Sequence, residues 1–403
     1  MNQNTLEKYK EVVGEEIIEE IVREAKPLKG KYVTHVNATY YGGGVAEILD
    51  SLVVLMNLVG INAGWRALKG TDHFFNITKL FHNGSQGGEA HLTPEIKKIY
   101  EGINERNSIF MHLEKSDAII AHDPQVLPLI NYYKKTQPWI WRCHIDISHP
   151  NPEIWNYLKE FIAKYDKMIV SDEKYIKNNI PVSQNIIMPS IDPLTAKNKK
   201  LSSEEAKGIL KKTGIDTDKP IVSQISRFDY WKDPIGVIEA FEIAKKKVDA
   251  HLVLLGNYAT DDPEGVTVYE EVVKRAQQSK DITILVNVEN NDLVVNALQT
   301  ISQVVLQKSL REGFALTVSE ALWKETPVIG GNTGGIPNQI IHGKNGYLVE
   351  NIQETADRIV ELLKDDEKRK KMGAYGKEFV RKNFLITRHL LDYIKLLKEQ
   401  MKL

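Results

Sequence analysis

The sequence predicts an α/β protein made of two doubly wound, Rossmann-like domains that face each other across a cleft. Three observations lead to this fold class. A chain of 403 residues is too long for one ordinary hydrophobic core. Short β-rich runs alternate with helical stretches from residue 31 and again from residue 220, which implies parallel sheets with helices on both faces. A passage rich in Pro, Lys and Ser, 193–203, separates the two runs and reads as a linker.

We therefore expect an N-terminal domain over 1–195 and a C-terminal domain over 216–384, with a helix over 385–403 that could pack back on the first. Apolar pairs at helical spacing predict an amphipathic helix near the N-terminus, over 5–26. In the first half we predict strands over 31–40, 118–121, 139–147 and 167–170, and helices over 45–59 and 152–165. In the second half we predict strands over 220–226, 251–255, 282–286, 304–307, 327–329 and 347–349, and helices such as 234–248 and 265–279. Ligands of such sheets bind beyond the carboxyl ends of the strands, so the cleft is the expected active site.

The composition narrows the class of protein. Hydrophobic residues make up 42% and charged residues 27%, and the formal net charge of −1 gives no general reason to expect nucleic acid or an anionic membrane as a partner. The single Cys143 excludes internal disulfides and fits a reducing cytoplasm. We expect no secretory signal and no membrane span, because no basic segment precedes an apolar one and no apolar run is long enough. Abundant Lys and Glu suggest a thermophilic source.

The most informative segment is Arg311–Glu320, which follows an apolar strand end and runs into a helix. A strand, a glycine-containing turn and a helix start form an anion site, because free backbone N–H groups and the helix dipole point at the ligand. Glu312 and Glu320 flank this site, eight residues apart, which favours a phosphate bordered by hydroxyl groups, as in a nucleotide-sugar. The alternative is an ordinary helix start with solvated glutamates.

Two further loops could contact the same phosphates. Arg227 and Lys232 lie five residues apart after the first strand of the second half, where Arg can act as a bidentate fork and Lys as a point charge. Ordinary surface charges are the alternative. Gly42, Gly43 and Gly44 follow the first strand and allow close backbone approach to a ligand, although a tight turn would use glycines equally well.

Polar residues at two strand ends of the first half are candidates for a second ligand. His144 and Asp146 share one parity of an extended chain, so both can face the cleft if the strand persists. His122 and Asp123 end the preceding strand. A buried, hydrogen-bonded His144 is the alternative, and a zinc site made by His122, His144 and His149 has poor local spacing. The loops 256–257 and 334–337 are more typical of turns than of ligand contacts.

Together these residues resemble the retaining GT-B glycosyltransferases. The resemblance covers most of the chain and is carried by Glu312 with Glu320, by Arg227 with Lys232, and by the glycine loop 334–336. In the first half, residues 81–87, 122–125 and 144–146 are similar to the trehalose glycosyltransferring synthases of thermophiles.

The resemblance implies transfer of glucose from UDP- or ADP-glucose to free glucose, which gives α,α-trehalose with retention and could be reversible. It implies that Glu320 holds the ribose, Glu312 a donor-sugar hydroxyl, and Val288 the base. The amides of Phe314, Ala315, Leu316 and Thr317 would cap the phosphates, and Ala315 departs from the family, which often has Gly there. The acceptor would contact Gln86, His122, Asp123, Arg142, His144 and Asp146.

No metal or other cofactor is expected to be required, although Mg²⁺ could stimulate the reaction with the nucleotide. The expected partners are a nucleotide-sugar donor and a monosaccharide acceptor, and a homodimer is possible. Three alternatives stay open: a trehalose phosphorylase, an enzyme with another sugar or sugar-phosphate acceptor, and a non-catalytic nucleotide-sugar sensor.

Overall fold

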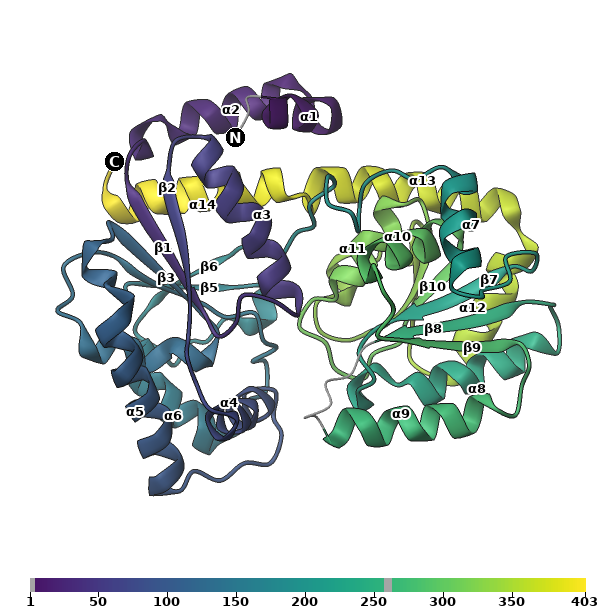
Figure 1. Ribbon diagram of the computed structural model, residues 1–403, viewed down its shortest axis with the longest axis horizontal. Coiled ribbons are helices and arrows are strands. Elements are labelled where there is room, and N and C mark those ends of the chain that lie inside the picture. Colours follow the sequence, from purple (N-terminus) through teal and green to yellow (C-terminus); the bar gives the residue numbers. More distant parts are fainter. Residues whose placement is uncertain (1–3, 257–262) are drawn as a thin grey trace. The chain divides into compact units, whose positions relative to one another are not determined.

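The computed structural model describes residues 4–256 and 263–403 and consists of two compact units (Figure 1). Unit 1 contains the chain up to Ser190 together with Ile386–Leu403, and unit 2 contains Ile191–Leu385. Each unit is built on one six-stranded sheet in which every pair of neighbouring strands is parallel. Strand and helix alternate along the chain in both units, as parallel pairing requires. The predicted fold class of two Rossmann-like sheets is confirmed.

The sheet of unit 1 has the strand order β2-β1-β3-β4-β5-β6. Its strands are β1 Tyr32–Asn37, β2 Asn62–Ala67, β3 Ala118–His122, β4 Trp139–Arg142, β5 Lys167–Val170 and β6 Ser183–Ile186. Its helices are α1 Asn4–Val13, α2 Glu15–Ala25, α3 Gly44–Leu58, α4 Asp72–Ser85, α5 Pro94–Met111, α6 Pro152–Ile162 and α14 Ile386–Met401. One face of the sheet packs on α4, α5 and α6 through a cluster that includes Phe81, Tyr100 and Trp141. The C-terminal α14 packs against α2 and α3 of the same unit.

The sheet of unit 2 has the order β12-β11-β10-β7-β8-β9. Its strands are β7 Ile221–Ile225, β8 His251–Gly256, β9 Ile282–Val286, β10 Val304–Gln307, β11 Val328–Gly331 and β12 Gly346–Val349. Its helices are α7 Ser203–Lys212, α8 Pro234–Lys245, α9 Pro263–Ala276, α10 Asn291–Ile301, α11 Leu316–Trp323, α12 Ile352–Lys364 and α13 Asp366–Asn383. Helices α8, α9 and α12 cover one face, and α7 and α10 cover the other.

Several local predictions are wrong. The single helix predicted over 5–26 is interrupted at Gly14, whose φ of 93° takes the chain out of the helical region. The strand predicted over 139–147 ends at Arg142. The passage predicted as a linker packs on unit 2, where the side-chain amide of Asn296 donates to the backbone oxygens of Ala196 and Lys199 at 2.9 and 2.8 Å. Within the part of the chain described, no helix is long and apolar enough to cross a membrane.

Candidate functional site

The site residues of unit 2 gather at the carboxyl ends of two adjacent parallel strands, β7 and β10. Nζ of Lys232, in the loop after β7, donates to Oε2 of Glu312, in the loop after β10, at 2.5 Å. The two side chains are only 17% and 11% exposed, so the ion pair is largely shielded from solvent. Two of the residues predicted for the site are therefore in direct contact, although they are 80 positions apart in the chain.

Neutral groups at the end of β10 complete the environment of this ion pair. Oε2 of Glu312 also accepts hydrogen bonds from Nε2 of Gln307 and Oγ of Ser309, both at 3.3 Å. The next residue of the same loop, Lys308, is mostly buried and pairs with Asp233. The sequence did not predict Gln307, Lys308 or Ser309 as site residues. Their only signal was a run of polar residues directly after a buried strand.

Arg227 lies on the same loop as Lys232 and differs from it in exposure. Its side chain is 66% exposed, and its guanidinium donates to Oδ2 of Asp229 at 3.1 Å. Asp229 also accepts from the backbone N–H of Trp231 at 2.8 Å, which fixes the turn that leads to Lys232. An exposed guanidinium keeps its hydration, so Arg227 can meet an anion without first leaving a buried partner.

The start of α11 is the predicted phosphate cap. Ala315 precedes the helix with φ 70° and ψ 80°, a left-handed conformation in which an alanine is strained and a glycine is not. The side-chain amide of the fully buried Gln339 donates to the backbone oxygens of Phe314 and Ala315. The ring of Phe314 is buried and packs edge-on against Phe384, and Leu316 is the first helical residue.

The glycine loop after β11 packs on the same turn. A Cβ on Gly334 would overlap the backbone oxygen of Glu312, and one on Gly335 would come within 2.8 Å of the backbone oxygen of Gly313. The loop 334–337 therefore has a specific function in packing the backbone of the Glu312 turn. In the other predicted turn, 256–257, Gly256 ends β8 and Asn257 lies outside the described residues.

Glu320, Thr317 and Val288, which were also predicted to bind the donor, have no hydrogen bond to the Lys232–Glu312 ion pair within the part of the chain that the structure describes. The side chain of Glu320 in α11 is 4% exposed, and its two carboxylate oxygens face Nε2 of Gln299 at 3.2 Å and Nζ of Lys197 at 3.8 Å. The hydroxyl of Thr317 donates to the backbone oxygen of Ile225, which ties the helix start to the end of β7. Val288 is half-buried and packs on the apolar cluster beneath α10.

In unit 1 the glycine loop after β1 is open. Gly42 and Gly43 have φ of 82° and 83°, and a Cβ on either would meet nothing within 4 Å. Gly43 caps α3, which begins at Gly44 without a side-chain cap. The left-handed backbone explains the glycines at 42 and 43 as turn residues, and the open space leaves the start of α3 accessible to a ligand.

The predicted histidines of unit 1 form a hydrogen-bonded row. Nδ1 of His35 lies 3.0 Å from Nε2 of His122, and Nδ1 of His122 lies 2.9 Å from Nε2 of His144. Burial lowers the pKa of all three imidazoles, that of His35 to about 3, so the rings are neutral at pH 7. His35 was missed because it lies inside a strand rather than at its end.

Asp123 and Arg142 flank this row. Oδ1 of Asp123 accepts from the backbone N–H of His144 at 2.7 Å, and burial raises the pKa of its carboxyl to about 7. Arg142 is fully buried and donates to the hydroxyl of Ser171 at 3.1 Å. Because β4 ends at Arg142, the strand does not persist to His144 and Asp146, and the two residues do not share one face of it as expected.

The remaining predicted residues of unit 1 lie in loops. Oδ1 of Asp146 accepts from the backbone and hydroxyl of Ser148 at 2.9 and 2.6 Å, so its carboxylate organises the turn. Gln86 caps the C-terminus of α4 and is half-buried. His149 is exposed, and the residues described include no group of three His, Cys, Asp or Glu that could hold a metal ion.

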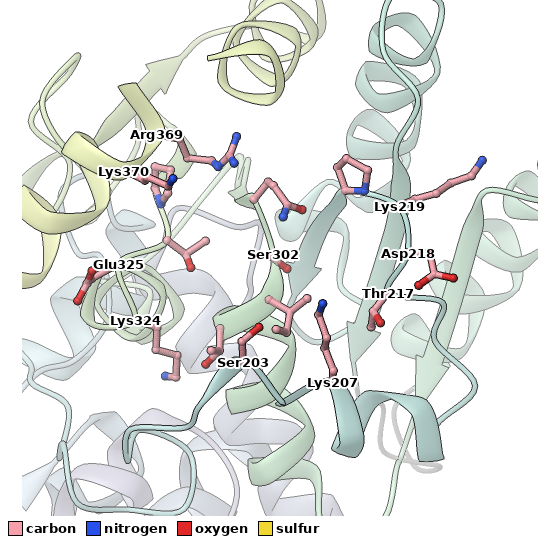
Figure 2. Close-up of a pocket in the computed structure, with 16 residues that line it drawn as sticks. Ser203, Lys207, Thr217, Asp218, Lys219, Ser302, Lys324, Glu325, Arg369 and Lys370 are labelled. Atoms are coloured by element: carbon pink, nitrogen blue, oxygen red, sulfur yellow. The ribbon is translucent and has the colours of Figure 1, made fainter. Parts of the chain in front are cut away.

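One pocket of unit 2 lies at the opposite end of the sheet from these residues. It has a volume of about 450 Å³ and is lined by Pro220, Gln303 and Pro327, which immediately precede β7, β10 and β11. Lys219 and Ser302, which line the same pocket, are labelled in Figure 2. Two cations at its border have partners elsewhere: Lys219 pairs with Asp249 and Asp281, and Arg369 with Asp366. In parallel α/β sheets ligands bind at the carboxyl ends, so this pocket is not the predicted site.

Comparison with known proteins agrees with the fold. Residues 35–177 match the family described as "Trehalose synthase, N-terminal domain", and residues 206–379 match "Glycosyl transferases group 1". The trehalose synthase of Thermococcus litoralis is 45% identical over 396 residues, which covers 97% of this chain and 96% of that protein. The trehalose phosphorylase of Grifola frondosa is 28% identical and covers 93% of this chain but 58% of its own length. The structure of the trehalose-6-phosphate synthase OtsA superposes with a TM-score of 0.76 at 14% identity, covering 92% of this chain and 99% of that chain.

Proposed function

The chain belongs to the trehalose synthase family of group 1 glycosyltransferases, and on that premise we propose that it transfers glucose from a nucleoside-diphosphate glucose to free glucose. The product would be α,α-trehalose, with the anomeric configuration of the donor retained. The observation that carries the proposal is the shielded pair of Lys232 and Glu312 at the carboxyl ends of β7 and β10. A cation and a carboxylate held together match a ligand that carries phosphate and sugar hydroxyls side by side.

The donor would be bound by exchange of partners within unit 2. In the structure the ammonium of Lys232 is neutralised by Glu312. A diphosphate that enters this position takes over the ammonium and releases the carboxylate, which can then accept hydrogen bonds from the hydroxyls of the transferred sugar. Arg227, which is exposed on the same loop, would add a second cation to the diphosphate.

The nucleoside would extend along α11 in this proposal. The backbone N–H groups from Phe314 to Thr317 would face the phosphates at the start of α11, where the helix dipole favours negative charge. Glu320 would accept hydrogen bonds from the ribose hydroxyls, because a buried carboxylate has strong acceptors in a fixed position. Val288 would contact the base with an apolar side chain.

The chemistry proposed is attack from the face that the leaving group occupies. The bond from the sugar's anomeric carbon to the diphosphate oxygen breaks, and a bond from the same carbon to the acceptor oxygen forms on the same face. The proton of the acceptor hydroxyl moves to the departing phosphate oxygen. Arg227, Lys232 and the amides stabilise the charge on that oxygen, and one such donor can contribute ~3 kcal/mol. His144 and Asp146 would orient the sugars from unit 1.

No metal is needed in this proposal, because cationic side chains and a helix start supply the positive potential at the diphosphate. Transfer is therefore expected to continue in the presence of EDTA, with at most a stimulation when Mg²⁺ is added. Loss of all activity with EDTA, restored by Mg²⁺, would contradict this part of the proposal.

A trehalose phosphorylase is the second candidate, because members of that class are related to this chain at 28% identity. The two activities differ in the leaving group, which is a nucleoside diphosphate in one and inorganic phosphate in the other. The test incubates the protein with glucose and UDP- or ADP-glucose in one arm, and with trehalose and phosphate in the other. Trehalose identified by NMR in the first arm supports the transferase, whereas glucose 1-phosphate in the second arm alone supports the phosphorylase.

A further inference from the structure

Two of the three histidines of unit 1 lie in the neighbouring strands β1 and β3, and the third, His144, lies two residues beyond the end of β4. His35 in β1 is in register with Ile120 of β3, and His122 lies two residues further along β3. His122 in turn is in register with Arg142 of β4, and His144 lies two residues further along the chain. Residues two apart on a strand share a face, so the rings of His35 and His122 lie on the face that Tyr393 of α14 covers.

Neutral imidazoles in a row can share protons in only two ways. Each ring carries one N–H, and each hydrogen bond needs one N–H and one bare nitrogen. Either every ring is protonated at Nδ1, or every ring is protonated at Nε2. Other titratable groups near the row do not favour a third, ionised state, because Arg142 and the neighbouring His389 both act to lower the pKa of His122 and His144.

The His35 end of the row determines which of the two protonation patterns has the lower free energy. Nε2 of His35 is buried, and no residue of the described chain pairs with it. In the Nε2–H pattern this atom would be a buried N–H without an acceptor, which is rare and costly in folded proteins. In the Nδ1–H pattern it is a bare nitrogen, which costs less. The Nδ1–H pattern is therefore favoured along the whole row.

We propose that His35 and His122 are positioning residues that fix the proton of His144 on Nδ1. His144 is the partly exposed ring of the three, and no partner of its Nδ1 occurs among the described residues. The row therefore turns His144 into a neutral hydrogen-bond donor of fixed direction at the surface of unit 1. Its backbone is held as well, because its N–H donates to Asp123.

The ligand that fits such a donor is an uncharged sugar hydroxyl or ring oxygen that accepts one hydrogen bond. That the sugar is a substrate rests on the proposed function, whereas the position of the proton does not. A neutral donor does not attract an anion in the way that an imidazolium would. We therefore expect His144 to favour an unphosphorylated sugar over a sugar phosphate.

The direct test is NMR of the protein labelled with ¹⁵N in its histidine rings, with the signals of His144 identified by their loss in His144→Ala. We expect a protonated Nδ1 and a bare Nε2 for His144 at pH 7. A ring protonated at Nε2, or an even mixture, would overturn the proposal without any variant being needed. If the ring is protonated at Nδ1 and the protein makes no trehalose, the proposed function fails and the row stands.

Variants of His122 test the consequence for transfer. His122→Leu removes the donor to Nε2 of His144, so we expect a mixed protonation of the partly exposed His144 ring and about a tenfold loss in kcat/KM for glucose. His122→Asn can place an amide N–H where Nδ1 lies, so it is expected to recover most of both. Binding of UDP to the proposed donor site of unit 2 is expected to be unchanged in both variants.

A buried histidine outside the row supplies the matched control. His251 of unit 2 is 7% exposed and shares a hydrogen bond of 2.8 Å with Thr283. His251→Leu is expected to leave the His144 signals and the kcat/KM for glucose unchanged. If His122→Leu lowers kcat/KM while His144 stays fully protonated at Nδ1, the residue acts through packing alone and the positioning role is refuted.

Discussion

Burial of the Asp123 carboxyl predicts how the free energy of unfolding changes with pH. The residue is 8% exposed, and within the described part of the chain the hydrogen bond that its carboxylate accepts comes from the backbone N–H of His144. No ion pair to it occurs among the described residues. Removal from water disfavours the ionised form and raises the pKa of the carboxyl from 3.8 to about 7.

The sign of the pH effect follows from proton binding. Between these two pKa values the folded state holds the proton and the unfolded state has lost it. The free energy of unfolding therefore falls as the pH rises through this window, and the full cost is present above pH 7. At 1.36 kcal/mol for each pKa unit, the cost is about 2 kcal/mol at pH 5 and about 4 kcal/mol at pH 8.

Asp123→Asn removes the charge and keeps an oxygen in the position of Oδ1. The backbone at this residue has φ 61° and ψ 177°, and Asp and Asn share the strain of that conformation. The variant should therefore be more stable than the wild type, by up to about 4 kcal/mol at pH 8 and by about 2 kcal/mol less at pH 5. Hydrogen exchange of the amides in β3 and β4 measures this locally, because the two units need not unfold together.

The result that refutes the reasoning is a stability difference that does not grow between pH 5 and pH 8. Asp166→Asn is the matched control. Its carboxylate also accepts from a backbone N–H, that of Trp139 at 2.8 Å, but it is 35% exposed and pairs with Lys135. The gain for this control at pH 8 is expected to be well below that for Asp123→Asn.

Three further predictions concern unit 2. Arg227→Ala is expected to lower transfer by about 100-fold without loss of stability, because the guanidinium is exposed and its proposed role is in the transition state; steady-state kinetics and thermal melting measure the two effects. Gly334→Ala is expected to destabilise unit 2 by about 3 kcal/mol or more, since the new methyl group overlaps the backbone oxygen of Glu312, and urea unfolding measures the change. Glu312→Gln is expected to tighten the binding of UDP several-fold and to lower transfer at least about 100-fold, because it frees Lys232 for phosphate and removes the acceptor for the sugar; calorimetry and kinetics separate these results.

Each of these predictions has a control or a contradicting outcome. Arg23→Ala removes an arginine of similar exposure, 63%, from α2 and should leave transfer unchanged. Gly343 has φ 80° with nothing within 4 Å of a new Cβ, so Gly343→Ala carries the backbone strain without the overlap and should cost less than Gly334→Ala. Weaker UDP binding in Glu312→Gln would mean that the carboxylate does not compete with the phosphate for Lys232.

The sequence predicts the strands of unit 2 well because most of them are buried on both faces. Strands β8 and β10 are buried at every position, and each appears as a mostly apolar run with clear ends. The two strands that the sequence did not predict, β2 and β6, form the edges of the sheet of unit 1 and are only partly buried. Their polar sequences carry no such run.

The sequence predicts a site residue only where that residue belongs to a local sequence pattern. Loops at strand ends, with glycines, cations and carboxylates, singled out Lys232 and Glu312, and these two residues are in contact. The partners supplied by distant parts of the chain are not predictable in this way. His35 is 87 positions from His122, and no feature of the sequence around it distinguishes it from a core residue of β1.

The candidate residues of unit 1 are positioned by neutral hydrogen bonds, whereas those of unit 2 carry charges, so the two sets should respond differently to salt. His144 is positioned by hydrogen bonds between neutral groups in the core of unit 1, which added salt does not screen. Lys232 is positioned by an ion pair that the proposed diphosphate must replace, and Arg227 is exposed to solvent. Salt weakens the attraction between an exposed cation and an incoming anion. If the donor binds in unit 2 and glucose contacts His144, rising salt should therefore raise the KM for the nucleotide-sugar and leave the KM for glucose almost unchanged.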